Sequence, residues 1–494
     1  MSPLPLPDHV VSRGDRTSAR GLATNTGTAY FVGETEGGPV GPLRATSLDE
    51  FVDLAGGRVS TSVLYDCVET YFRVGGKGLY WSRVVSSTAT TAAGVMNDGA
   101  AAASLRVEAM GPGAYANAWA WRVLTNAQDA SIPAGQFVVQ VLASNQAGAA
   151  LIEVTPPVAS KAEAIGYANA NWRKARLIDQ ASANPPAAAG PTTFATAGAD
   201  NRAGIDDAAW QTALDRFPKL LGPGQVAAPG RTTSTAHLQV IAHAVANNRH
   251  ALLDLPDTST TATLTASMAA ANAAPEKGGR RAQALWPWAL VPGLAPFTNR
   301  LVPFSAVQAA LWAKIDGMGN PNEPAAGEDP QKRPTWLTGL SQPNPTPAVR
   351  TTLNDIGVNV ALLLPDGVAQ YGNRTTRRQQ EDPNWLQASG SREFMALEAE
   401  ADAVLARFVH EQNQKGALAG QLSGELVALC GVHFDRGALY GRTPADAFSV
   451  DTSMNTDATA AAGVLRAKIA ARVTPGADRV ELELVRVSPA EAVS

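Results

Sequence analysis

VLRAKIAARV (residues 464–473) and RVELELVRV (479–487) are two segments near the end of the 494-residue chain that alternate between apolar and charged positions. In the first segment the apolar row consists of Leu465, Ala467, Ile469, Ala471 and Val473. Ala, Leu, Lys and Arg favour a helix by intrinsic propensity, but alternation with a period of two is the stronger signal and predicts a strand. A turn-rich TPGAD sequence separates the two predicted strands.

The alternation also defines how these two strands would pair. An antiparallel ribbon with Val473 opposite Val480 places Ile469 opposite Leu484 and keeps the apolar rows together. A shift of one residue would place Glu481 in the apolar row, so the register is well specified. An isolated two-stranded ribbon is only marginally stable in water. The ribbon therefore needs further strands, either from its own chain or from another.

The composition is that of a globular protein with ample core, because 45% of the residues are hydrophobic and 17% are charged. The length suggests roughly two to four domains. A net charge of −4 gives no electrostatic basis for binding nucleic acid or an anionic membrane. Cys67 and Cys430 are too few for a disulfide framework and are predicted to be buried. With neither a signal peptide nor a membrane span in the pattern, we expect a soluble protein made in a cytoplasm.

Helix and strand signals alternate in two separate parts of the chain, 23–86 and 201–345. Thr28–Val32 predicts a strand, Ser47 begins a capping box, and Asp206 predicts the cap of a later helix. This order predicts a central α/β domain whose mainly parallel sheet is covered on both faces. Between the two parts, short alternating strands and one helix predict a β-rich inserted domain, bounded by linker-like sequences at 87–104 and 181–198.

The last third of the chain predicts a separate α+β domain. It opens with a buried strand at Ile356–Leu364, followed by a helix capped by Ser391, a short helix at about 424–430 and a strand at Ala447–Val450. We therefore expect an α/β and α+β multidomain protein. Its parts are a central α/β sheet domain (23–86 plus 201–345), an inserted β-rich outer domain (87–200), an α+β C-terminal domain (346–476) and extended N- and C-terminal arms (1–22 and 477–494).

No motif in the sequence indicates catalysis. The nearest phosphate-loop candidate, APGRTTS at 228–234, lacks the lysine and the glycine spacing, so it is predicted to be a turn between a strand and a helix. His433 lies near Cys430 and Asp435, but one cysteine and one histidine do not complete a zinc site. We predict no catalytic, cofactor-binding or metal-binding residues and no cofactor.

Several stretches together resemble the contractile tail sheath proteins, the outer-tube subunits of contractile phage tails and related bacterial injection systems. GTAYFVGETEGGPVGPLRATSLDEFVDLAGG (27–57) is similar to the opening domain of that family, and ALWPWALVP (284–292) to its central α/β domain. QYGNRTT (370–376), GALYG (437–441) and VTPGADRVELELV (473–485) are similar to its C-terminal domain. The order and spacing of these stretches over most of the chain carry the resemblance. The proline-rich start departs from the Gly-Val-Tyr strand usual in the family.

The resemblance implies a structural subunit that polymerises around an inner tube and contracts to drive the tube through a target cell envelope. The implied partners are further copies of the chain in stacked hexameric rings or a helical sheath, the inner tail tube protein, and baseplate and tail terminator proteins. Direct contact with nucleic acid and insertion into a membrane are not implied. The implied location is a virion tail assembled in the bacterial host cytoplasm, or a cytoplasmic contractile injection particle.

In sheaths, extended arms of neighbouring subunits complete a small sheet in the C-terminal domain of a third subunit, which is strand addition. The resemblance implies that the exchanged strands include Val10, Val11, Val480, Leu482, Leu484 and Val485. It also implies that the C-terminal domain faces the inner tube and that the inserted domain lies outermost. The candidate tube contacts are Arg377, Arg378, Arg392 and Arg407, and solvated surface arginines are the alternative at each position.

Two other classes of function are considered. A multidomain α/β enzyme would have its site at the C-terminal edge of the central sheet, and converging titratable groups there would favour it. A non-contractile binding or adhesin protein is the second alternative, and the disulfide-free composition argues against it.

Overall fold

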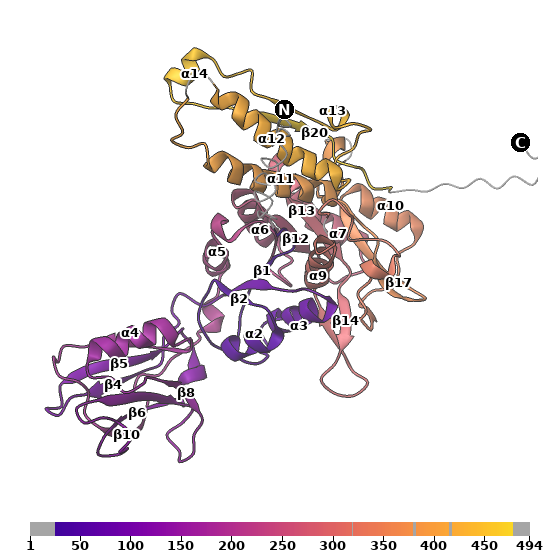
Figure 1. The fold of residues 1–494 in the computed structure, drawn as a ribbon. Helices are drawn as coiled ribbons and strands as arrows, with labels where there is room; N and C mark the ends of the chain where they lie inside the picture. Colours follow the sequence, from indigo (N-terminus) through magenta and orange to yellow (C-terminus); the bar gives the residue numbers. More distant parts are fainter. Residues whose placement is uncertain (1–24, 319, 379–381, 414–416, 478–494) are drawn as a thin grey trace, which may run out of the picture.

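The computed structural model describes residues 25–318, 320–378, 382–413 and 417–477 (Figure 1). The chain is elongated, with a C-terminal helical region at one end, a central sheet in the middle and the inserted domain at the other end. The predicted arms lie outside the described residues, apart from Ala477. The same holds for the second segment of the predicted terminal ribbon, so the pairing of that ribbon stays a prediction.

Eight described strands form the central sheet, in the order β18-β17-β13-β12-β11-β1-β3-β2. The inner strands run parallel, and β18 and β2 pair antiparallel at the two edges. The mainly parallel sheet predicted from the sequence is therefore confirmed, including the contribution of residues 23–86. The strands are β1 (Ala29–Gly33), β2 (Leu43–Ala45), β3 (Leu79–Arg83), β11 (Gln225–Ala227), β12 (His250–Asp254), β13 (Ala282–Trp286), β17 (Val358–Leu364) and β18 (Gly367–Gln370).

Successive residues of these strands face two separate apolar cores. On β1, Phe31 faces the core on one side of the sheet, whereas Tyr30 and Val32 face the core on the other. Because helices cover both faces, both sets of side chains are apolar. One face carries α2 (Leu48–Ala55), α3 (Leu64–Val74) and α9 (Phe304–Asp316); the other carries α5 (Asp207–Asp215), α6 (Ser234–Ala246), α7 (Thr261–Asn272), α8 (Glu276–Arg280) and α10 (Pro347–Asp355).

Local sequence signals predict some of these helices but do not predict helix α9. Ser47 and Asp206 are the N-caps of α2 and α5, accepting hydrogen bonds from Glu50 N and Ala209 N, as the capping pattern predicts. Helix α9 was not predicted, although eleven of its thirteen residues are buried. A helix enclosed on nearly all sides has no polar face, so its sequence lacks the apolar stripe that marks a surface helix.

The inserted domain consists of two sheets and one helix around its own core. Its elements are β4 (Ala93–Asn97), β5 (Ala103–Ala109), β6 (Ala120–Thr125), β7 (Phe137–Leu142), β8 (Leu151–Val154), α4 (Lys161–Asn171), β9 (Ala175–Asp179) and β10 (Ala189–Thr193). The β-rich character is confirmed, but the linker-like reading of 87–104 and 181–198 is wrong, since β4 and β10 lie within these stretches. Small residues are needed there: a Cβ at Gly94 would stand 2.4 Å from the indole of Trp121.

The central sheet continues past the boundary predicted at residue 346. Strand β17 pairs parallel with β13, with Val358 opposite Ala284, and β18 follows it as the edge strand. The apolar run at 356–364 correctly predicted a buried strand, but it contained no information about which sheet the strand joins. A smaller sheet, in the order β15-β14-β16, lies beside the central one and consists of β14 (Ala289–Pro292), β15 (Asn299–Val302) and β16 (Gly339–Leu340).

The C-terminal region contains a pair of long helices and a small sheet. Its elements are α11 (Ala388–Ala406), α12 (Leu418–Asp435), α13 (Pro444–Ala447), β19 (Phe448–Asp451), α14 (Asp457–Ala461) and β20 (Lys468–Ala471). Ser391 does not cap α11, because the helix begins at Ala388 and the Ser391 hydroxyl donates to the Arg280 carbonyl of the central domain. Helix α12 is much longer than the helix predicted at 424–430.

Candidate assembly site at the C-terminal sheet

The first predicted strand of the terminal ribbon is present in the structure. Strand β20 pairs antiparallel with β19, with Ile469 opposite Val450. Leu465 and Ile469 pack against the small core formed by α11 and α12, whereas the intervening Lys468 is exposed. The alternation predicted from VLRAKIAARV is therefore confirmed, and its apolar row faces the helices.

This small sheet is incomplete within the described part of the chain. It has two strands there. One edge of β20 pairs with β19, and the residues that follow β20 pair on the same side with residues 438–440 of the same chain. The backbone groups of Ile469 and Ala471 point to the opposite edge, where no described strand pairs with them. An exposed edge of this kind is a template for adding a strand from another chain segment.

The described chain begins and ends beside the first two turns of α11. At the C-terminal side, the backbone N–H of Gly476 donates to Gln387 Oε1 at 2.8 Å, and Gln387 Nε2 donates to the Gly476 carbonyl at 2.9 Å. At the N-terminal side, the Thr26 carbonyl accepts a hydrogen bond of 3.1 Å from Arg392. Both segments outside the described ranges therefore start next to one helix of the C-terminal region.

A buried ion pair holds this arrangement together. Arg392 on α11 is fully buried, and its guanidinium lies 2.6 Å from the carboxylate of Asp316 at the end of α9. The guanidinium also stacks over the ring of Trp312, 4.1 Å from its centroid, and the Thr26 hydroxyl donates to Asp316. One cluster thus joins the core helix α9, the C-terminal helix α11 and the entry into β1.

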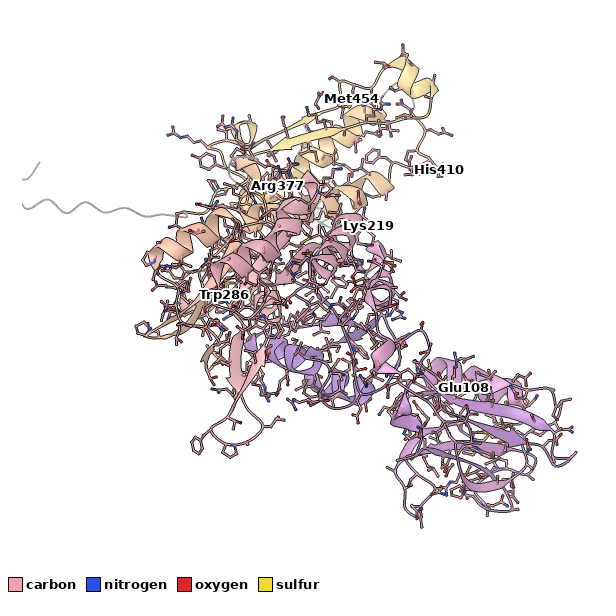
Figure 2. The ribbon with its side chains drawn as sticks, turned by 180° about the vertical axis from the view of Figure 1, so that it is seen from behind. Glu108, Lys219, Trp286, Arg377, His410 and Met454 are labelled. Carbon is pink, nitrogen blue, oxygen red and sulfur yellow. The ribbon has the colours of Figure 1, made fainter. Side chains whose placement is uncertain are left out.

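The four arginines predicted as tube contacts do not form one surface. The prediction that Arg392 contacts the tube is corrected, because its buried guanidinium cannot reach a partner protein in this conformation. Arg377 and Arg378 lie where the C-terminal region meets the central domain, as Figure 2 shows for Arg377, and only 9% of the Arg377 side chain is exposed. Arg407, near the other end of α11, keeps about half of its side chain exposed while pairing with Glu425. A contact with the tube stays a prediction for these last three residues.

Helices α11 and α12 are joined by a buried histidine between two carboxylates. His433 Nδ1 bonds to Glu393, and its Nε2 lies 3.2 Å from Glu400. Burial alone would lower the histidine pKa, but the hydrogen bonds that the ring donates to the two carboxylates outweigh burial and raise the pKa of His433 to about 9. His433 therefore carries a proton at neutral pH and links α12 to α11 through its two carboxylate partners. Among the described residues, no cluster of His, Cys, Asp and Glu is arranged to hold a metal ion.

The C-terminal edge of the central sheet holds one notable carboxylate, Asp254 at the end of β12. Burial raises its pKa to about 6, even though hydrogen bonds from Ser305 and Gly230 act in the opposite direction. Its oxygens accept from Ser305 N (2.9 Å), Ser305 Oγ (2.7 Å) and Gly230 N (3.1 Å). The carboxylate thus anchors the start of α9 and the turn at 228–234. This is a structural role.

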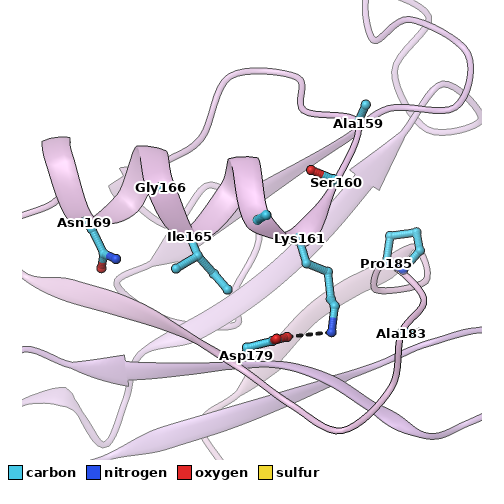
Figure 3. A pocket seen from close by; sticks show the side chains of 10 residues that line it. Ala159, Ser160, Lys161, Ile165, Gly166, Asn169, Asp179, Ala183 and Pro185 are labelled. Carbon is cyan, nitrogen blue, oxygen red and sulfur yellow. Dashed lines mark hydrogen bonds and ion pairs between the residues drawn. The ribbon is translucent and has the colours of Figure 1, made fainter.

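Neither of two cavities in the described chain is lined by Asp254. The larger, of about 680 Å³, is an open depression beside α4 in the inserted domain (Figure 3). Its one cationic group, Lys161, is engaged by Asp179 at 2.5 Å and by the backbone carbonyls of Ser104 and Gln180. The smaller, of about 240 Å³, lies between α2 and the inserted domain. Neither cavity gathers a nucleophile, a base and an oxyanion donor.

No helix within the described ranges combines the length and the apolar character that crossing a bilayer requires. No protein-family model and no curated protein sequence matches the chain. Solved structures do match. A sheath tail protein from Listeria innocua has a TM-score of 0.60 at 10% identity, covering 89% of this chain and 92% of that chain.

Two contracted assemblies are also similar. The helical sheath of the anti-feeding prophage in its contracted state matches with a TM-score of 0.54 at 15% identity, covering 93% of both chains. The sheath complex of the extracellular contractile injection system PVC, also contracted, matches with a TM-score of 0.55 at 13% identity, covering 94% of this chain and 92% of that chain. The chain therefore has the fold of contractile sheath proteins, and the resemblance predicted from the sequence is confirmed for the fold.

The ion pair of Arg392 gives a first testable expectation. Replacing Arg392 with Met leaves the Asp316 carboxylate buried without its partner, and we expect a loss of roughly 3–5 kcal/mol in the free energy of unfolding, measured by urea denaturation. The matched control is Arg407→Met, which removes an exposed pair and should cost about 1 kcal/mol or less. An Arg392→Met protein that unfolds at the urea concentration of the wild type would contradict the assignment.

The histidine between α11 and α12 makes stability depend on pH. Because the folded pKa is raised above the unfolded value of about 6.5, the stabilisation is complete below pH 6.5 and is lost as pH rises through about 9. The melting temperature should therefore fall over this interval. His433→Gln, which keeps a hydrogen-bond donor but no charge, should flatten that part of the profile. Parallel profiles for the two proteins would show that His433 is not the titrating group.

Proposed function

We propose that this chain is the structural subunit of a contractile sheath, which polymerises around an inner tube and contracts to drive the tube through a target cell envelope. The observation that carries the proposal is the likeness to two contracted sheaths over more than nine-tenths of the chain. Asp254 at the edge of the central sheet has no opening to substrate and is used to anchor α9, so nothing favours the enzyme alternative.

Assembly would proceed by strand addition at the C-terminal sheet. The free edge of β20 offers backbone groups at Ile469 and Ala471, and the alternating segment 479–487 has the pattern of a strand that could pair there. In this proposal Val480, Leu482, Leu484 and Val485, together with Val10 and Val11 of the N-terminal segment, belong to strands exchanged between subunits. The departure of both terminal segments from beside α11 supports exchange at one common sheet.

The energetics suit a lattice that changes shape without dissociating. Each fully buried Val or Leu contributes roughly 1.5–3 kcal/mol, and backbone hydrogen bonds fix the register. The exchanged strands would persist while the domains rotate as rigid bodies, since such rotations leave local pairing intact. Contacts with the inner tube, with Arg407 as the exposed candidate, and with baseplate and terminator proteins complete the proposed set of partners. Assembly would take place in a bacterial cytoplasm.

Electron microscopy of the purified protein tests this proposal. The wild type, at micromolar concentration and with the inner tube protein present as a template, should form striated hollow tubes. Leu482→Asp together with Leu484→Asp places charges in the apolar row of the exchanged strand, so this variant should remain a soluble monomer. The control Glu481→Gln with Glu483→Gln changes the opposite face and should still assemble. Tubes formed by the Leu482→Asp, Leu484→Asp protein would refute strand exchange.

A further inference from the structure

The hairpin of β14 and β15 ends in an exposed apolar tip. Its loop, GLAPFT at 293–298, contains no charged residue. Phe297 is fully exposed and Leu294 is 71% exposed. Figure 1 shows the hairpin projecting from the central domain on the side away from the C-terminal region. Two large apolar side chains held together in solvent are typical of a surface that binds a partner.

The tip is closed by hydrogen bonds, and its base is tied to the central domain. The N–H of Gly293 donates to the Thr298 carbonyl at 2.7 Å, and Thr298 Oγ1 donates to the Ala295 carbonyl at 2.6 Å, which closes the loop. At the base, Arg300 of β15 pairs with Glu69 at 2.9 Å and with Asp66, both on α3. Because the base is tied to the central domain, little conformational freedom would be lost when the tip binds.

A receptor of matching chemistry exists elsewhere on the same chain. The cavity of about 240 Å³ between α2 and the inserted domain is walled by Leu54, Tyr115, Trp119 and Ile152. Charged residues, Glu36, Asp53 and Lys174, line its remaining sides. It is smaller than the roughly 300–1,000 Å³ of small-molecule sites and is of the size that takes one aromatic ring. An apolar pocket surrounded by polar groups is the usual receptor for an aromatic interface anchor.

The hairpin and the pocket of one chain cannot meet each other. Figures 1 and 2 both show the hairpin on one side of α2 and α3 and the inserted domain on the other. We propose that Phe297, flanked by Leu294, inserts into the pocket lined by Tyr115, Trp119 and Ile152 on a second copy of the chain. The contact joins two different surfaces, so repeating it generates a ring or an open helix rather than a closed dimer.

This contact rests on the proposed self-assembly and adds to it a link that is independent of the terminal strands. A lipid surface is the other occupant to consider for an apolar tip. Stable attachment of a small apolar tip to a membrane needs a second signal, such as a basic patch for anionic headgroups. Arg300 of β15 and Arg58, which shares its partners, are instead paired with Asp66 and Glu69. The observations therefore favour a second copy.

The test uses two variants of the full chain that each carry one added cysteine, Phe297→Cys and Ile152→Cys, mixed and mildly oxidised. The native Cys67 and Cys430 are buried and serve as a silent background. We expect a disulfide-linked dimer containing one copy of each variant, identified by a mass tag on one of them. Leu220→Cys, an exposed apolar position away from the hairpin, replaces Phe297→Cys in the control and should give no such dimer. Mixed dimers no more abundant than in this control would overturn the proposal.

Sedimentation velocity over a concentration series gives the second readout. Phe297→Asp should weaken self-association at least tenfold, whereas Leu220→Asp should leave it unchanged. If Phe297→Asp associates like the wild type while Leu482→Asp, Leu484→Asp does not, the hairpin contact is wrong and the proposed function stands. If the mixed dimer forms but no tubes are seen with the inner tube protein, the contact stands and the proposed function fails. Binding of wild type, but not of Phe297→Asp, to phosphatidylglycerol vesicles would assign the tip to lipid and overturn the contact.

Discussion

The buried ion pair between Arg392 and Asp316 is the interaction on which the arrangement of the molecule depends. Asp316 ends the core helix α9, and Arg392 lies in the second turn of α11, so the pair fixes the C-terminal region to the central domain. The Thr26 carbonyl and hydroxyl join the same cluster. Since a buried charge without its partner is strongly destabilising, the cluster holds three distant parts of the chain in one place. The small sheet and both chain segments that lead to it are positioned as a consequence.

The interface between the C-terminal region and the central domain, called the seam below, differs in composition from the two large cores of the central domain. Ion pairs cross it, Arg281 with Glu398 and Lys219 with Asp402, although Ala388 at the start of α11 packs into an apolar core of the central domain. The apolar cluster between α11 and α12 is small by comparison, with three buried residues, Val404, Leu422 and Leu426. Polar contacts between domains break and re-form more readily than apolar packing. Motion of the C-terminal region relative to the central domain is therefore expected. A sheath that contracts by rigid-body rotation would move such a seam while the central sheet and its two cores stay intact.

Local signals in the sequence predicted the parts of the fold that are locally determined. Asp206 and Ser47 cap helices because capping needs neighbours within a few residues, and the alternation at 464–473 identified β20 for the same reason. Helix α9 was missed because complete burial removes the polar face. The place of β17 in the central sheet, the burial of Arg392 and the pairing of His433 with Glu393 depend on residues tens to hundreds of positions apart. For Arg392 the sequence offered one hint, an arginine among the apolar residues of a helix, which fits a buried pair as well as a surface contact.

The central claim is that the edge of β20 is completed by a strand from another subunit. It is tested most directly in a chain carrying both Ile469→Cys and Leu484→Cys, two positions that face each other in the predicted register, oxidised in assembled tubes and run on a non-reducing gel. Exchange between subunits predicts a ladder of disulfide-linked multimers that disappears on reduction. Monomers with an internal disulfide and no ladder would show that the ribbon closes within its own chain, which would contradict the claim.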